Sequence, residues 1–116
     1  MMATTEECRT ALDTLSDNLA RTDGDVRRAA ALDRSLSCHI TDLGITFTGR
    51  LADGRIEVLD TRQGPPGEKA QIRLAMAGDD LVAMVGGRLN FARAWASGRV
   101  RLEAGVRDLL RLRALL

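Results

Sequence analysis

Few residues in this chain have the type and the spacing that a chemical site requires. His39 is the only histidine, and it falls on the polar side of an alternating segment with Asp42 nearby in the sequence. A general base needs a partner within hydrogen-bond reach, so we interpret His39 as a surface residue. Helix capping accounts for the closest pair of acids, Asp79 and Asp80. We therefore predict no catalytic residues and a protein that is not an enzyme.

Ligands for a metal ion or a phosphate group are also scarce. One His and two Cys are too few for a structural zinc site, and Cys8 and Cys38 lack Cys-x-x-Cys spacing. Both fall on apolar positions of their segments, which predicts buried free thiols. Gly86 and Gly87 end a predicted helix, whereas the glycines of a phosphate loop precede one. No metal and no cofactor are predicted.

Length and composition are typical of one globular domain. The 116 residues are 45% hydrophobic and 28% charged, with a net charge of +1, which predicts a single domain over 1–116. No apolar run approaches the ~20 residues that span a bilayer, and residues 1–10 are too acidic and polar for a signal peptide. We expect a cytoplasmic protein with no stable membrane insertion. The excess of Arg over Lys favours a GC-rich bacterial source.

Charge is distributed unevenly along the chain. Residues 1–25 hold six acids and two Arg, a balance of −4, and residues 88–116 hold seven Arg and two acids, a balance of +5. A basic segment attracts phosphate or carboxylate groups, yet these arginines alternate with apolar residues as on a solvated face. Aromatic residues make up 3% and Tyr is absent, so stacking platforms for nucleic acid are missing. No nucleic-acid partner is predicted.

The N-terminal third is predicted to be helical. Thr4 and Glu7 form a Ser/Thr-x-x-Glu capping box. Apolar residues then recur at the helical period, at positions 8, 11, 12, 15 and 19. The sequence Thr-Asp-Gly-Asp at 22–25 ends this helix, and Asp25 is expected to cap a short second helix over 26–32.

From residue 34 the apolar period changes to two, which predicts a sheet. Alternation over 34–40, 45–51 and 56–58, with a hairpin signal at Asp53-Gly54, predicts an antiparallel meander over 34–60. Two Pro and two Gly in 61–69 predict a surface loop. A fourth strand is expected over 70–77.

Two short helices, a strand and a closing helix are predicted to complete the chain. Asp79 is expected to cap a helix over 80–85, and Asn90 a helix over 91–97 that ends at Gly98. Phe91 and Trp95 are neighbours at i,i+4. A fifth strand over 99–103 is followed by a helix over 106–116, whose apolar sector holds Val106, Leu109, Leu110, Leu112 and Leu116.

The predicted order of elements is α-α-β-β-β-β-α-α-β-α. Helices segregated from a run of hairpin strands are typical of an α+β domain. We predict a five-stranded mixed, mainly antiparallel sheet with helices packed on one face. The connection from the fourth strand through two helices to the fifth is a crossover, which allows that pair to be parallel.

The C-terminal half resembles the sterol carrier protein 2 family. The resemblance rests on Ala-Gly-Asp-Asp-Leu-Val-Ala-Met at 77–84, on Gly87, and on Trp-Ala-Ser-Gly-Arg-Val-Arg-Leu at 95–102. The order of the preceding elements extends it over nearly the whole chain, although Glu-Ala-Gly at 103–105 stands where the family often has Gly-Asp. The resemblance implies a small sheet with helices on one face around an apolar tunnel for lipids.

Two hypotheses about function follow. The first, implied by the resemblance, is non-catalytic binding or transfer of a hydrophobic ligand: a fatty acid, an acyl-CoA or a sterol-like lipid. Its expected apolar lining is Met76, Leu81, Met84, Val85, Leu89, Phe91, Trp95, Leu109 and Leu112, and its head-group candidates are Arg88, Arg93 and Arg111. The same apolar residues also fit a solid core. The alternative is a ligand-free interaction module that forms a homodimer through the outer sheet face, at Ser35, Ser37, Thr46 and Thr48.

Overall fold

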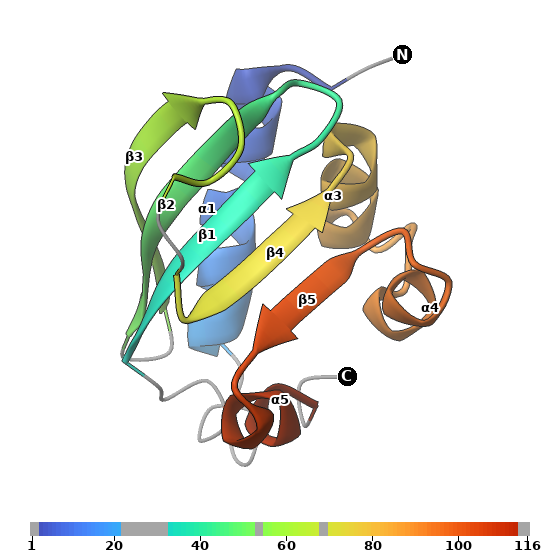
Figure 1. The fold of residues 1–116 in the computed structure, drawn as a ribbon. Coiled ribbons are helices and arrows are strands. Elements are labelled where there is room, and N and C mark those ends of the chain that lie inside the picture. Colours follow the sequence, from blue (N-terminus) through green and yellow to red (C-terminus); the bar gives the residue numbers. More distant parts are fainter. Residues whose placement is uncertain (1–2, 22–32, 53–54, 68–69, 114–116) are drawn as a thin grey trace.

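The computed structural model contains one five-stranded sheet with the strand order β3-β2-β1-β4-β5 (Figure 1). It describes residues 3–21, 33–52, 55–67 and 70–113. The strands are β1 (Arg34–Ile40), β2 (Ile45–Ala52), β3 (Arg55–Gln63), β4 (Ile72–Met76) and β5 (Arg101–Ala104). The helices are α1 (Thr5–Arg21), α3 (Gly78–Val85), α4 (Phe91–Ala96) and α5 (Val106–Arg113). The predicted α+β class and mixed sheet are confirmed, while the predicted helix over 26–32 and the Asp53-Gly54 turn lie outside the described residues.

The central strand β1 pairs with β2 in an antiparallel and with β4 in a parallel arrangement. The parallel pairing of the fourth and fifth strands that the crossover allowed does not occur, because β4 and β5 pair antiparallel. The parallel pair is β1 and β4, since the connection after β3 returns the chain to the end of the sheet where β1 begins (Figure 1). The strand β4 thereby enters between β1 and β5, and the helices α3 and α4 turn the chain back into β5.

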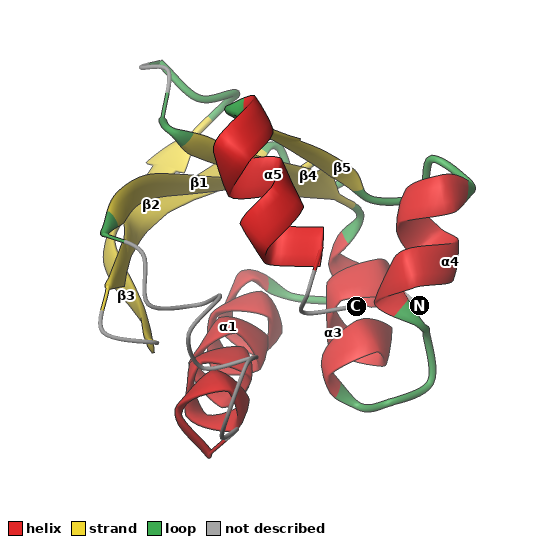
Figure 2. Cartoon of the chain, turned by 90° about the horizontal axis from the view of Figure 1, so that it is seen from below, coloured by secondary structure: helices red, strands yellow, loops and turns green. Residues whose placement is uncertain are grey.

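The helices lie on one side of the sheet, with α1, α3 and α5 beneath it and α4 beside the β5 edge (Figure 2). The core forms on this side from fully buried large side chains, among them Leu12, Ile40, Met76 and Leu81. Each such side chain contributes about 1.5–3 kcal/mol by its removal from water. Helix α1 is fixed at its far end by Ser16, whose hydroxyl accepts a hydrogen bond from the backbone N–H of Ile56 at the β3 edge (2.9 Å).

The predicted helix caps were partly right. The Thr4–Glu7 capping box is confirmed by two reciprocal hydrogen bonds of 3.1 Å. Asn90 caps α4, because its Oδ1 accepts from the backbone N–H of Arg93 (3.2 Å). Gly98 follows α4 with φ +83°, a left-handed conformation in which a side chain would be strained.

The predicted cap of α3 was wrong. The helix begins at Gly78 and its N-cap residue is Ala77, which makes no side-chain capping bond. Asp79 lies inside the first turn instead. The N-terminus of α3 is capped by Asp42, which lies in the turn between β1 and β2. Its carboxylate accepts a hydrogen bond from the Gly78 N–H (2.9 Å).

Two further predictions of length and exposure were wrong. Strand β3 continues to Gln63, into the segment predicted as a loop. The register irregularity opposite Thr48 and Gly49 leaves Leu59 as an extra residue of β3, so its alternation is broken before this segment. In α5, Val106 and Leu110 are 76% and 63% exposed. Only part of the predicted apolar sector of this helix is therefore covered by the rest of the protein.

Candidate ligand-binding site

The helix-covered face of the sheet carries two separate apolar clusters. The first packs α1 and α3 against one end of the sheet and contains Cys8, Leu12, Cys38, Ile40, Phe47, Met76 and Leu81. The second, at the other end, is formed by Leu36, Leu51 and Ile72. The strand pairing places both on one face, because Leu36 is opposite Ile72 and Ile40 opposite Met76. Leu74, half-buried, packs against both clusters and marks the boundary between them.

The predicted apolar lining divides between these regions. Met76 and Leu81 are 2% and 0% exposed within the first cluster, which is the position of core residues. The half-buried members that pack against its margin are Met84, Val85, Leu89 and Phe91. Trp95 and Leu109 are half-buried as well, and the side chain of Leu112 lies outside the described part of the chain.

Half-buried apolar side chains therefore border both clusters. Phe91 and Trp95 face each other on α4, with ring centroids 6.1 Å apart and a tilt of 47° between the rings. On the sheet, Leu102 and Ala104 of β5 pack beside the second cluster. Apolar surface that stays partly in water gains free energy when another apolar group covers it. We name this border, from α3 and α4 across β5 to α5, the apolar margin. Its residues are Met84, Val85, Leu89, Phe91, Trp95, Leu102, Ala104 and Leu109.

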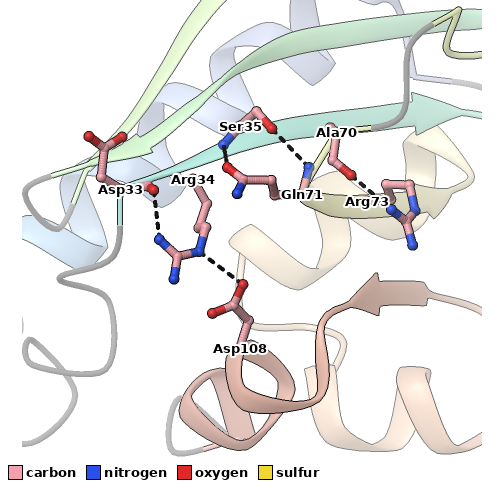
Figure 3. A network of polar contacts seen from close by, with 7 residues as sticks. All are labelled: Asp33, Arg34, Ser35, Ala70, Gln71, Arg73 and Asp108. Atoms are coloured by element: carbon pink, nitrogen blue, oxygen red, sulfur yellow. Dashed lines mark hydrogen bonds and ion pairs between the residues drawn. The ribbon is translucent and has the colours of Figure 1, made fainter.

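Helix α5 is tied to the sheet next to the apolar margin by one ion pair (Figure 3). Arg34, the first residue of β1, donates from Nε to Oδ2 of Asp108 at 3.0 Å, and its Nη1 donates to the carbonyl oxygen of Asp33 at 2.9 Å. Asp108 is buried although it is charged. A buried carboxylate requires a partner of this kind. The pair thus fixes where α5 sits.

A second polar contact joins the starts of the parallel strands in the same region (Figure 3). The backbone N–H of Ser35 donates to the side chain of Gln71 (3.1 Å), and the backbone N–H of Gln71 donates to the Ser35 hydroxyl (2.8 Å). Arg73 adds a bond from Nη1 to the carbonyl oxygen of Ala70 (2.8 Å). These bonds hold the end of the sheet above α5 in one arrangement.

Two of the three predicted head-group arginines do not lie in a buried setting. Arg88 and Arg93 are exposed, and the side chain of Arg111 lies outside the described part of the chain. Arg34 was missed, although its signal was present: it shares the inward parity of Leu36 in an alternating strand, where a charged residue is unexpected. It is a cation at the border of the second cluster.

The two thiols are buried in the first cluster and are free. Burial, and next the charge of Asp42, raises the pKa of Cys8 to about 11. Burial, and next the nearby Cys8, raises the pKa of Cys38 to about 12. Both therefore stay protonated near neutral pH, in the unreactive form. Among the described residues, no three His, Cys, Asp or Glu side chains gather as metal ligands would.

The fold is similar to solved structures of sterol carrier proteins. The sterol carrier protein domain 2 of Helicoverpa armigera has a TM-score of 0.65 and 15% identity, over 99% of this chain and 91% of its own. The Sterol Carrier Protein 2 Like 2 of Aedes aegypti has a TM-score of 0.62 and 13% identity, over 96% and 97% of the two chains. At these identities the likeness shows the fold alone.

The same fold also resembles part of an enzyme. The stereoselective inverting sec-alkylsulfatase Pisa1 from Pseudomonas sp. is 23% identical with a TM-score of 0.55, over 90% of this chain but only 16% of the enzyme. The curated protein sequences contain no match to this chain. Within the described residues, no helix is long and apolar enough to cross a membrane.

The sequence itself carries the family assignment. The sequence model of the SCP-2 sterol transfer family matches residues 12–116, which include every strand and the apolar margin. The chain therefore belongs to the SCP-2 sterol transfer family.

Proposed function

We propose that the chain binds or transfers a hydrophobic ligand on the helix-covered face of its sheet, without catalysing a reaction. The observation that supports this best is the set of half-buried apolar side chains that border the two clusters of that face. A solid core would be expected to bury Phe91, Trp95 and Leu102 fully. Membership of the SCP-2 sterol transfer family supports the same class of ligand.

The ligand's apolar body would contact the apolar margin, and an acidic head group would lie near Arg34. Burying an alkyl chain contributes ~0.8 kcal/mol per methylene group. Ten buried methylenes contribute about 8 kcal/mol before the cost of association. Micromolar affinity corresponds to about 8 kcal/mol after that cost, so more than ten methylenes must be buried or the head group must contribute. No catalytic group is needed. A fatty acid fits Arg34 with its single carboxylate, while acyl-CoA and sterol-like lipids are the other members of the class to test.

Binding is measured with the chain's own reporter, because Trp95 is its single tryptophan. Palmitate, palmitoyl-CoA and cholesterol are titrated separately while Trp95 fluorescence and the midpoint of thermal unfolding are followed. We expect saturable binding of at least one ligand and a rise in the midpoint. A ligand at 100 times its Kd stabilises the folded state by about 2.7 kcal/mol.

A bulky substitution separates a cavity from a solid core. Ala104→Phe adds volume beside the second cluster, whereas Ala75→Phe makes the same change on the opposite face of the sheet, as the strand pairing shows. If the apolar margin holds a ligand, Ala104→Phe abolishes binding with little loss of stability, and Ala75→Phe preserves binding. The proposal fails if no ligand binds and Ala104→Phe costs the 1–3 kcal/mol typical of an overpacked core.

The homodimer alternative has less support, because two of its predicted contact residues are buried within the chain itself. Ser37 and Thr46 are each 1% exposed on the outer sheet face. Their side chains would therefore add almost no contact area to an interface with a second copy. Light scattering of the concentrated protein tests association directly.

The cytoplasmic location and the bacterial source of the chain stay predictions.

A further inference from the structure

The outer face of the sheet, opposite the helices, contains a hollow of about 180 Å³. Its floor comes from β1 and β2, and its wall from Arg62 of β3 and from residues 65–67 and 70. The lining residues are Ser35, Leu36, Ser37, Thr46, Thr48, Gly49, Arg62, Pro65, Pro66, Gly67 and Ala70. The hollow is therefore separated from the apolar margin by the sheet itself.

The hollow has a rigid wall. Gly64, where the connection begins, is held twice: its carbonyl oxygen accepts from the Thr46 hydroxyl (2.8 Å), and its N–H donates to the carbonyl oxygen of Gly44 (2.6 Å). His39 is hydrogen-bonded to the same segment, because its Nδ1 lies 3.0 Å from the carbonyl oxygen of Ile45 and 3.1 Å from the Thr46 hydroxyl. A carbonyl can only accept, so Nδ1 of His39 carries the hydrogen. Proline rings at 65 and 66 stiffen the next two positions.

The floor contains a polar group that the fold leaves unused. Ser37 is 1% exposed, and its hydroxyl has no hydrogen-bond partner among the described residues. Its cross-strand neighbour is Thr48, which also lines the hollow. Buried hydroxyls are nearly always paired, and an unpaired one favours a bound partner that supplies the missing bond.

Charge and size restrict what that partner is. Arg62 is the one charged residue among the described residues of the lining. Its Nε donates to Asp60 at 3.2 Å, while its Nη1 lies on the side of the connection, 4.0 Å from where a Cβ on Gly67 would be. One cation balances one negative charge, and two prolines remove the backbone N–H donors that a phosphate group would use. The volume is more than ten times the ~10–15 Å³ that one water needs, which leaves room for a small organic molecule.

We propose that this hollow is a second binding site, for a small monocarboxylate. The carboxylate lies between the guanidinium group of Arg62 and the hydroxyls of Ser37 and Thr48, and the organic part contacts Pro65 and Pro66. A long-chain lipid is too large for this volume. The site is independent of the proposed lipid function, so a negative result for either proposal leaves the other unaffected.

The test is an NMR titration of the whole chain, labelled with ¹⁵N, with lactate and benzoate against their neutral amides, lactamide and benzamide. We expect the acids to shift the backbone amide signals of Ser37, Thr48 and Gly67 with a Kd on the order of 1 mM or below, and the amides to bind at least about tenfold more weakly, the usual effect of losing a charge-assisted hydrogen bond. Equal binding of acid and amide, or no shift of these three signals at millimolar acid, overturns the proposal.

Variants locate the site. Arg62→Gln is expected to weaken benzoate binding about tenfold, and Asp60→Asn to strengthen it by releasing Arg62. Arg101→Gln, an exposed arginine of β5 outside the lining, is the matched control and leaves the Kd unchanged. Ser37→Ala is expected to weaken binding without lowering the thermal midpoint, because the hydroxyl has no partner in the fold. A lowered midpoint with unchanged Kd assigns Ser37 a structural role and refutes its part in the site.

Discussion

Asp42 and Gly78 are joined by a hydrogen bond across 36 residues, in which the backbone N–H of Gly78 donates to Oδ1 of Asp42 at 2.9 Å. The bond replaces an ordinary N-cap, because Ala77 at the start of α3 has no side chain that can accept. It also links the β1–β2 turn to the helix that leads into the apolar margin. A carboxylate at this position further favours the helix through its N-terminal partial charge.

Replacing the distant cap is expected to destabilise the protein measurably. Asp42→Ala should lower the free energy of unfolding by about 1 kcal/mol, and Asp42→Asn by less, because an amide oxygen still accepts the bond. Asp79→Asn, in the first turn of α3 without a capping bond, should cost only about 0.3 kcal/mol. Urea unfolding followed by circular dichroism measures all three. Equal losses for Asp42→Ala and Asp79→Asn would show that the bond contributes nothing specific.

Gly78 also has a steric role, in contact with α1. A Cβ at this position would lie 2.9 Å from Sγ of Cys8 and 3.3 Å from Cβ of Ala3. Gly78→Ala is therefore expected to lower the free energy of unfolding by about 1–3 kcal/mol, although Ala is the better helix former. In a Cys8→Ala background the additional loss should be smaller by roughly 1 kcal/mol, since the clashing atom is absent. Gly105→Ala, where no atom lies within 4 Å, is the control.

The buried thiols predict a loss of stability at high pH. Both pKa values rise on folding, from 9.0 to about 11 for Cys8 and about 12 for Cys38, first because of burial. A raised pKa means that the folded state prefers the protonated thiol, so this contribution is complete below pH 9 and is lost as the pH rises through 11. The chain has no Tyr and a single Lys, so few other side chains titrate in this range.

Urea unfolding at pH 8, 9.5 and 11 checks this prediction. The wild-type free energy of unfolding should fall over this range, and the variant with Cys8→Ala and Cys38→Ala should show a flatter profile, whatever its absolute stability. The comparison is between slopes, because each Ala also leaves a small cavity. Parallel profiles for the two proteins would show that other groups control the alkaline transition.

Local sequence patterns correctly predicted those elements that are determined by interactions between residues close together in the chain. The alternation around Leu36 and Phe47 predicted two strands, and Thr4 with Glu7 predicted the start of α1, because the groups that interact are within a few residues of each other. Asn90 predicted the start of α4 for the same reason. The family resemblance extended this reading to the whole sheet.

The errors involve partners distant in the chain. No local pattern of β4 shows that it enters beside β1 instead of pairing in parallel with β5. Asp79 has the local signature of a cap, yet the bond is made by Asp42 from another turn. Arg34 and Asp108 are 74 residues apart, and only the fold shows that they form an ion pair. The same limit hid the hollow, because Ser37 and Pro65 line it together only in the folded chain.

The Arg34–Asp108 pair predicts how firmly α5 is held. Removal of a partner from a fully buried ion pair costs 3–5 kcal/mol, but the Arg34 side chain is 34% exposed and also donates to Asp33. Asp108→Ala should therefore lower the free energy of unfolding by about 1–3 kcal/mol, between the values for exposed and buried pairs. The effect should be local, with faster hydrogen exchange of the α5 amides and unchanged exchange in β1.

Hydrogen exchange followed by mass spectrometry resolves the two elements. Asp13→Ala is the matched control, because Asp13 pairs with Arg9 at 3.6 Å on the exposed side of α1 and such pairs contribute about 0–1 kcal/mol. If Asp108→Ala accelerates exchange in α5 and also weakens fatty-acid binding, the helix forms part of the ligand site. If exchange in α5 is unchanged, the helix is held by its apolar contacts with β5 and not by the ion pair.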